Sequence, residues 1–376
     1  MLAPSQPDSS LTEQVVRLQA LLEASRAVHS TIVLAEVLRI AARIAVLELE
    51  LEGALFTSPH TLYGEFPDSF DHLPRFDLLS RDGHLLSQFI VAPGHELSLF
   101  ERDFLEGLTL QTAVAVENAI NHERHLEYAR LARDLDAARA IQRSLLPQSM
   151  PILRGYTLAA RSRACYEVGG DYLDVVTEPD GGQLMVVADV AGKGMASALI
   201  AATFRSAFRT LARQSLTLRE LAGRLSQQHY EEGEEARRRY VTAIFLRLDP
   251  TAGDLEVVNA GHNPGFLLSP TGVATLIKAS GTPLGMLPGS RYTVERATLA
   301  PGARILLYTD GLTEVFQGPE DNQEEFGEDR LLAAFAATQP QPAETTLDTL
   351  WQTLDTFAQG AHQEDDMSAI TLTRTQ

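Results

Sequence analysis

Several residue types are scarce in this sequence of 376 residues, and each shortage excludes a class of protein. The single cysteine, Cys165, cannot form an intramolecular disulfide, which excludes a disulfide-stabilised secreted scaffold. The first residues lack the basic and apolar segments of a secretion signal, and no apolar run approaches the roughly 18 residues that cross a bilayer. We therefore expect a soluble, cytoplasmic protein.

Basic residues are also few, since 31 lysines and arginines face 50 aspartates and glutamates and leave a net charge of −19. An acidic surface of this size repels nucleic-acid phosphates and anionic lipids, so the sequence predicts neither partner. Two of the basic residues are lysines, Lys193 and Lys278. The length suits two domains, because a single core rarely extends over so many residues.

The first part of the chain has the pattern of a small α+β domain. Apolar residues recur at helical spacing over residues 11–49, with a break near Ser30, and short β-like runs follow at 51–57 and 85–91. A further helix is predicted to begin near Ser98, which matches a capping box with Glu101.

Residues 122–149 are predicted to continue this helix as a linker, because no helix breaker occurs before Pro147. Charged residues crowd the segment, while one set of positions keeps a coiled-coil-like spacing. This pattern predicts that two copies of the chain pair through the linker; the alternative is a solvated helix that lies on its own domain. The seam positions are Leu131, Leu135, Ala138, Gln142 and Leu145.

Residues 150–376 combine short strands, glycine turns and one strongly apolar helix, which indicates stacked sheets covered by helices. Strands are expected at 157–160, 184–190, 240–248, 255–259, 265–268, 304–308 and 368–373, and helices at 195–212, 218–229, 328–337 and 343–358.

Four acidic motifs lie at strand ends or turns of this region: GGDYLD at 169–174, ADVAGKG at 188–194, YTDG at 308–311 and EDDMS at 364–368. Carboxylates at the mouth of a buried sheet are costly unless positive charge compensates them. One lysine supplies too little positive charge to compensate five aspartates, so the motifs predict that a divalent metal binds there. Oxygen ligands without a Cys–His cluster favour Mg²⁺ or Mn²⁺ over zinc, and two such ions activate water for attack on a phosphoester.

In order and spacing, GGDYLD, DVAGKG, VNAGHNPG, GTPLG, YTDGLTE and DDMS resemble the metal-dependent PPM serine/threonine phosphatases, in their bacterial SpoIIE/RsbU-like branch. The resemblance covers residues 146–373. It implies an α/β sandwich of two antiparallel sheets flanked by helices, with a pair of Mn²⁺ or Mg²⁺ ions as cofactor.

The same resemblance assigns roles to individual residues. Asp189 would bridge both metals, the carbonyl of Val190 would bind one, and Asp310 and Asp365 would hold the other. Asp171 would orient a metal-bound water without binding metal itself. Asp171, Asp189, Asp310 and Asp365 form the predicted catalytic set.

Some positions depart from the family pattern. Asp366 lies one residue after the usual ligand, so a supporting role is expected for it rather than coordination. Ala188 and Ala191 replace the usual Gly and Ser, and neither side chain ligates metal. Eukaryotic relatives carry a proposed acid histidine at the position of Ala191, so here metal-bound water would protonate the leaving serine oxygen.

Gly192, Lys193 and Gly194 open the helix expected from residue 195. Glycine permits tight backbone geometry at a helix N-terminus, which favours anions, so these three residues are candidates for phosphate binding or for support of the metal ligands. For Lys193 the alternative is a simple ion pair with an aspartate.

Other notable residues have structural interpretations. His262 in AGHNPG is expected to belong to a structural turn, and Cys165 to packing. The run of acids and arginines at 231–239 is typical of a solvated helix face, with phosphoprotein binding by its arginines as the alternative.

Residues 21–121 resemble a GAF domain through LLEASRAVHSTIVLAEVLRIAARIAV at the start and FERDFLEGLTLQTAVAVENAI at the end. The segment between is short for the family. Two interpretations stay open: a regulatory domain with a small-molecule pocket, or a dimerisation and relay domain without ligand. The linker ending in AARAIQRSLLPQSMP is similar to the segment preceding SpoIIE/RsbU-like phosphatase domains, which implies that signals from a ligand or an upstream protein pass through it.

Together these features predict a homodimeric protein phosphatase with an N-terminal tail and helix at 1–20, a GAF-like regulatory domain at 21–121, a linker helix at 122–149 and a PPM-type domain at 150–376. By resemblance, the substrate would be a phosphoserine or phosphothreonine on a STAS-domain anti-anti-sigma factor. We also expect linker geometry to set metal affinity. The competing interpretation is a signalling scaffold without turnover; a nucleic-acid phosphodiesterase is disfavoured by the charge.

Overall fold

The computed structural model describes residues 9–278, 280–319, 323–339 and 341–375. The chain divides into two compact units, Met1–Ala132 and Arg133–Gln376. Within the described ranges, no helix is both long enough and apolar enough to cross a membrane.

The first unit is an α+β domain with one four-stranded antiparallel sheet in the order β2-β1-β4-β3. Its strands are β1 (Gly53–Thr57), β2 (His60–Gly64), β3 (Arg75–Leu79) and β4 (Leu85–Ala92). Its helices are α1 (Ser9–Val28), α2 (Leu34–Glu48) and the first part of α3 (Leu99–Leu145). The two helices predicted around a break at Ser30 are confirmed, as are the strands predicted at 51–57 and 85–91.

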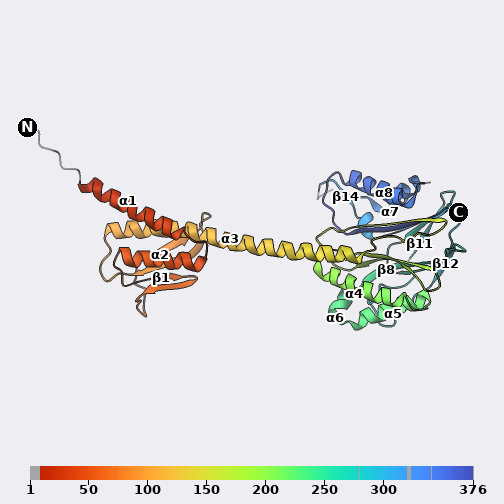
Figure 1. The fold of residues 1–376 in the computed structure, drawn as a ribbon, viewed down its shortest axis with the longest axis horizontal. Coiled ribbons are helices and arrows are strands. Elements are labelled where there is room, and N and C mark those ends of the chain that lie inside the picture. The colour runs from red at the N-terminus through yellow and green to blue at the C-terminus, as the bar shows by residue number, and fades with distance from the viewer. Residues whose placement is uncertain (1–8, 279, 320–322, 340, 376) are drawn as a thin grey trace, which may run out of the picture. The chain divides into compact units, whose positions relative to one another are not determined.

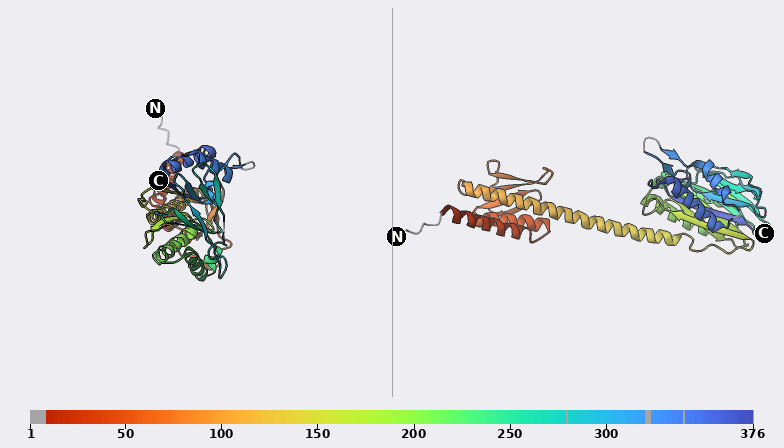
Figure 2. Two further views of the ribbon diagram at one scale, coloured as in Figure 1. Left: turned by 90° about the vertical axis from the view of Figure 1, so that its right-hand side faces the viewer. Right: turned by 90° about the horizontal axis from the view of Figure 1, so that it is seen from above.

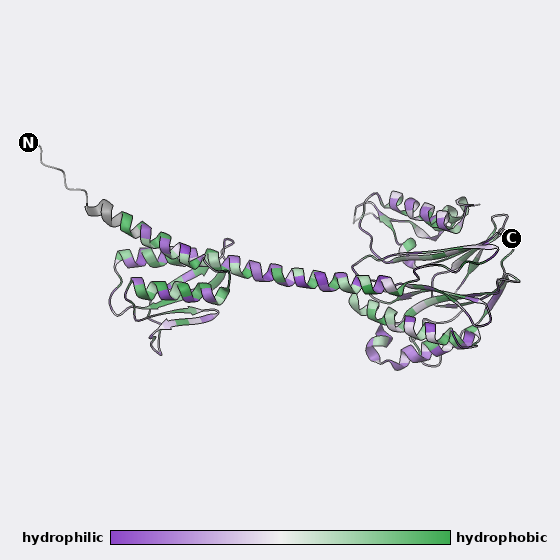
Figure 3. Cartoon of the chain, viewed as in Figure 1, coloured by the Kyte–Doolittle hydropathy of each residue, from purple (hydrophilic) through white to green (hydrophobic). Residues whose placement is uncertain are grey.

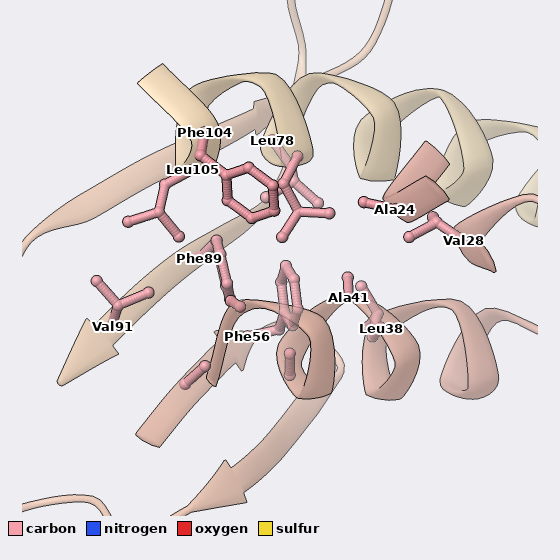
Figure 4. Close-up of a cluster of buried hydrophobic side chains, with 14 of the residues drawn as sticks. Ala24, Val28, Leu38, Ala41, Phe56, Leu78, Phe89, Val91, Phe104 and Leu105 are labelled. Carbon is pink, nitrogen blue, oxygen red and sulfur yellow. The ribbon is translucent and has the colours of Figure 1, made fainter. Parts of the chain in front are cut away.

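The core of this unit follows from the alternation of side chains along its strands. Phe56 of β1 and Phe89 of β4 are fully buried, and their rings stack with centroids 4.4 Å apart. Phe104 of α3 and Leu38 of α2 pack in the same cluster (Figure 4). One face of the sheet therefore packs against α1, α2 and the first part of α3 in a single apolar core.

Helix α3 begins where the capping box predicts. The Ser98 N–H donates to the Glu101 carboxylate at 2.7 Å, and the Glu101 N–H donates to Ser98 Oγ at 3.3 Å. Hydrogen bonds from Ser98 and His95 lower the pKa of Glu101 to about 2. The helix then runs without a break to Leu145, and its middle is mostly hydrophilic (Figure 3).

The second unit contains two five-stranded antiparallel sheets, in the orders β11-β10-β13-β16-β5 and β12-β9-β8-β7-β6, with a small β14-β15 pair. The strands are β5 (Tyr156–Arg163), β6 (Tyr172–Thr177), β7 (Gln183–Val190), β8 (Val241–Leu248), β9 (Asp254–Ala260), β10 (Gly265–Leu268), β11 (Ala274–Ile277), β12 (Glu295–Thr298), β13 (Arg304–Tyr308), β14 (Phe316–Gln317), β15 (Glu324–Glu325) and β16 (Met367–Arg374). The helices are α4 (Met195–Leu211), α5 (Leu218–Glu231), α6 (Glu234–Arg238), α7 (Gly327–Ala337) and α8 (Ala343–Ala358), with the 3₁₀ turn η1 (Asp310–Leu312).

The two sheets pack face to face with helices on both outer sides (Figures 1 and 2). Met185 and Val187 of β7 meet Ile305 and Leu307 of β13 in the core between the sheets. Helices α4 and α5 cover the sheet that contains β7, while α7 and α8 cover the other. The expected sandwich of two antiparallel sheets flanked by helices is confirmed, and every strand and helix predicted in this region is present.

Candidate active site

The alternation of side chains along four strands directs polar residues to one end of the space between the sheets. On β7, Met185 and Val187 point into that space, so Asp189 at the strand's end points the same way. The same parity applies to Asp171 before β6, Thr309 after β13 and Asp366 before β16. Strands far apart in the sequence thus deliver their polar ends to one place.

Strand register brings the predicted catalytic residues together in pairs. Tyr172 pairs with Ala188, which sets Asp171 beside Asp189. Tyr308 pairs with Ala369, which sets Asp310 close to the turn that carries Asp365. Burial, followed by the charges of Asp310 and Asp365, raises the pKa of Asp189 to about 7. The carboxylates lie near enough to repel one another.

Asp171 is buried and accepts hydrogen bonds from neighbouring hydroxyl groups. Its Oδ2 accepts a hydrogen bond from Thr309 Oγ1 at 2.7 Å, and Thr309 Oγ1 in turn accepts the Ser368 N–H at 2.9 Å. Burial, then the charge of Asp189, raises the pKa of Asp171 well above its usual range. This geometry fixes the direction of the carboxylate and suits an orienting role. Thr309 was missed by the sequence prediction.

Asp366 binds the backbone of the loop that precedes β6 through its carboxylate. Its carboxylate accepts the Gly170 N–H at 2.6 Å and the Cys165 N–H at 2.7 Å. A Cβ on Gly169 would lie 2.2 Å from the same carboxylate, which explains why glycine stands there. A Cβ on Gly170 would lie 2.9 Å from the carbonyl oxygen of Val190. Asp366 therefore positions the GGD loop through its backbone.

Asp310 is the first residue of η1, and its position depends on the next residue. A Cβ on Gly311 would lie 1.9 Å from the carbonyl oxygen of Asp366, so the two turns pack backbone to backbone. Burial, then the charge of Asp365, raises the pKa of Asp310. Glu314, which the sequence prediction missed, belongs to the same group of charges, since burial, Asp310 and Asp365 raise its pKa.

Lys193 forms an ion pair with an aspartate. It lies between Gly192 (φ 100°) and Gly194 (φ 79°), both in the left-handed region that favours glycine. Its Nζ is 3.1 Å from Asp365 Oδ2 and donates to the carbonyl oxygen of Glu364 at 2.6 Å. The glycine turn thus directs the ammonium toward the acidic group.

His262 and Cys165 have structural contacts. Burial lowers the pKa of His262 to about 4, so the ring is neutral; Nε2 donates to the Tyr308 carbonyl at 3.0 Å and Nδ1 accepts from Thr242 Oγ1 at 2.8 Å. This ring holds the strand end that precedes Thr309. Cys165 Sγ lies 2.9 Å from the carbonyl oxygen of Gln363, and burial raises the pKa of its thiol.

The acidic group fits a hard divalent cation by its chemistry. Its donors are carboxylate and carbonyl oxygens, and its mutual repulsion is compensated in part by the ion pair between Lys193 and Asp365. In the part of the chain that the structure describes, no three His, Cys, Asp or Glu side chains already converge as a finished metal cage.

The arrangement of the second unit is that of a PP2C-type domain. The SiaA-PP2C domain of Pseudomonas aeruginosa superposes with a TM-score of 0.58 at 22% sequence identity, covering 66% of this chain and 98% of that domain. Residues 179–375 match the model of the stage II sporulation protein E (SpoIIE) family, which is just over half of the chain. The chain belongs to the SpoIIE family.

Two curated relatives have a similar sequence. Protein IcfG of Synechocystis is 29% identical over 268 residues, which cover 64% of this chain and 41% of IcfG. Phosphoserine phosphatase RsbP of Bacillus subtilis is 28% identical over 185 residues, which cover 48% of this chain and 45% of RsbP. The chain thus matches less than half the length of either relative.

Proposed function

We propose that this protein is a metal-dependent protein serine/threonine phosphatase. The main support is that Asp171, Asp189, Asp310 and Asp365 lie close together at one end of the sandwich. They offer only oxygen donors, and the chain belongs to the SpoIIE family. The name of the relative RsbP, a phosphoserine phosphatase, supports the same reaction.

The proposed roles fall on residues that the strand register brings to one end of the sandwich. Asp189, the carbonyl of Val190, Asp310 and Asp365 would hold two Mn²⁺ or Mg²⁺ ions, which when bound supply Lewis-acid activation of water and neutralise phosphoryl oxygens. Asp171, fixed by Thr309, would orient the attacking water through its carboxylate. Ala191 offers no proton donor, so the proton for the leaving serine oxygen would come from water.

Hydrolysis is tested on the full chain with p-nitrophenyl phosphate and with a phosphorylated STAS-domain protein. We expect turnover that depends on added Mn²⁺ and stops with EDTA, and turnover of the phosphoprotein at much lower substrate concentration. The STAS-domain substrate follows from the motif resemblance. Absence of hydrolysis at every Mn²⁺ concentration, in a folded protein that still binds the phosphoprotein, would favour the scaffold alternative.

We also propose that two copies pair through exposed apolar residues of their helices. On α3, Leu126 and Leu131 are 57% and 53% exposed, and on α1, Leu18 and Leu22 are also exposed. Such residues are typical of a helix that packs against a second copy. The GAF-like unit would then act as the regulatory and dimerisation domain.

The last residues of α3 form hydrogen bonds with other parts of the second unit. Gln142 donates to the Gly169 carbonyl at 2.6 Å and accepts the Gly169 N–H at 3.1 Å. Arg205 of α4 donates to the Leu145 carbonyl at 2.7 Å. Gln142 is therefore engaged by its own domain rather than free for a seam. These contacts support a route by which linker movement reaches the GGD loop and the helix after Asp189.

Replacing Gln142 by alanine tests this route. We expect the Mn²⁺ concentration for half-maximal activity to change about fivefold or more, since coupling between sites typically amounts to 1–3 kcal/mol. The matched control is Ser144→Ala, whose hydroxyl bonds to the Ile141 carbonyl of its own helix. If Gln142→Ala has the wild-type rate and Mn²⁺ dependence with and without upstream effectors, the linker hypothesis is wrong.

A further inference from the structure

Lys193 connects two turns that carry the proposed metal ligands. It follows β7 and Asp189 in one sheet, while its partners, the Asp365 carboxylate and the Glu364 carbonyl, lie just before β16 in the other. The ammonium is therefore a bridge across the mouth of the sandwich. No other lysine is available for this place, because Lys278 is the second of two in the sequence.

The contact occupies one side of a carboxylate that the site needs. Asp365 Oδ1 accepts the N–H of Asp366 at 2.8 Å, and Oδ2 lies 3.1 Å from Lys193 Nζ. Both oxygens thus already have partners. Each carboxylate oxygen has two lone pairs, so the contact leaves one free on Oδ2, but it places a positive charge beside that oxygen and so opposes the approach of a cation.

We propose that Lys193 is a built-in counter-ion of Asp365, and that its ammonium competes with a divalent cation for this carboxylate. The pair keeps the metal-free site from accumulating repulsion, and it lowers the affinity of the Asp310–Asp365 side for metal. Lys193 is a positioning residue in this account. The inference rests on the proposed metal-dependent function.

The size of the effect follows from the exposure of the pair. The Lys193 side chain is 47% exposed and that of Asp365 is 28% exposed, so solvent screens the attraction. The interaction free energy of such partly exposed ion pairs is equivalent to a change in affinity of about twofold to fivefold. Removing the ammonium should tighten metal binding by that factor.

The test is calorimetric titration of Mn²⁺ into the full chain without substrate. Lys193→Met should bind Mn²⁺ about twofold to fivefold more tightly than wild type. Lys193→Arg, which keeps the charge, should resemble wild type, and so should Lys278→Met, which removes an equal charge elsewhere. In an Asp365→Asn background, Lys193→Met should have no further effect, because the pair is already gone.

Equal or weaker Mn²⁺ binding by Lys193→Met would overturn the inference. An effect that persists in the Asp365→Asn background would also overturn it, since the ammonium would then act through its general field. A wild-type chain that binds no Mn²⁺ at all would instead refute the proposed function, so the two failures are distinguishable.

Discussion

Replacing Asp189 by asparagine is expected to abolish phosphate hydrolysis while it stabilises the metal-free fold. Hydrolysis should fall by at least about 10³-fold, because a carboxylate proposed to hold the ions would be lost. Stability should rise because the Asp189 carboxylate is buried among Asp310, Asp365 and Asp366, whose charges oppose its ionisation. A residue kept for its chemistry at the expense of stability shows this pair of effects.

The stabilisation should depend on pH in a defined direction. The pKa of Asp189 is raised from 3.8 to about 7. Between pH 3.8 and about pH 7, Asp189 is therefore protonated in the folded state and ionised in the unfolded chain. The contribution of Asp189 to stability is therefore greatest below about pH 3.8 and is lost progressively as the pH rises to about 7. At pH 8 the asparagine variant should be more stable than wild type by about 2–4 kcal/mol, and the gap should shrink toward pH 5.

This pH dependence is measured by urea unfolding in EDTA at several pH values, with Asp68→Asn in an exposed loop as control. The control should follow wild type throughout. A wild-type protein that is more stable than Asp189→Asn at pH 8, or an asparagine variant with near-normal hydrolysis, would remove Asp189 from the site.

Replacing Gly311 by alanine is expected to have the largest effect on folding. The added Cβ would lie 1.9 Å from the carbonyl oxygen and 2.8 Å from the carbonyl carbon of Asp366, and both are backbone atoms that cannot rotate away. We expect a loss of about 3 kcal/mol or more, with displacement of Asp310 from Asp365. Mn²⁺-dependent hydrolysis should be lost together with stability.

A second glycine provides the control for this substitution. Gly223 lies within α5, and a Cβ there would meet no atom within 4 Å. Gly223→Ala should be neutral or stabilise the fold by up to about 1 kcal/mol, because alanine favours helix. Comparison of both variants by chemical unfolding checks the argument. Equal stability of Gly311→Ala and Gly223→Ala would show that the two turns do not pack as described.

Local patterns in the sequence were sufficient for most of the architecture. The capping box at Ser98 and the uninterrupted helical spacing before Pro147 predicted α3, and apolar runs predicted β7, β13 and β16. Strands without such a signal were missed. The four residues of β12 are exposed or half-buried, and β11 buries only Ile277, so neither carries a clear alternation. β6 was missed because its first three residues belong to the acidic GGDYLD motif.

For the site too, local sequence was sufficient to predict some residues but not others. The aspartates were found because each stands next to an apolar strand, and the family resemblance supplied their roles. Their partners depend on how two sheets align: Thr309 meets Asp171 from 138 residues away, and Gln142 meets Gly169 from 27. Strand alternation, applied to β13, is the signal that predicts an inward Thr309.

Anomalous diffraction at the manganese edge shows most directly whether these carboxylates hold divalent cations. Crystals of the full chain grown with saturating Mn²⁺ should show manganese peaks between Asp189 and Asp310, with Asp365 as a ligand and Lys193 turned away. Peaks only at other places, with Asp189, Asp310 and Asp365 uncoordinated in protein that hydrolyses phosphate in the same solution, would contradict the account.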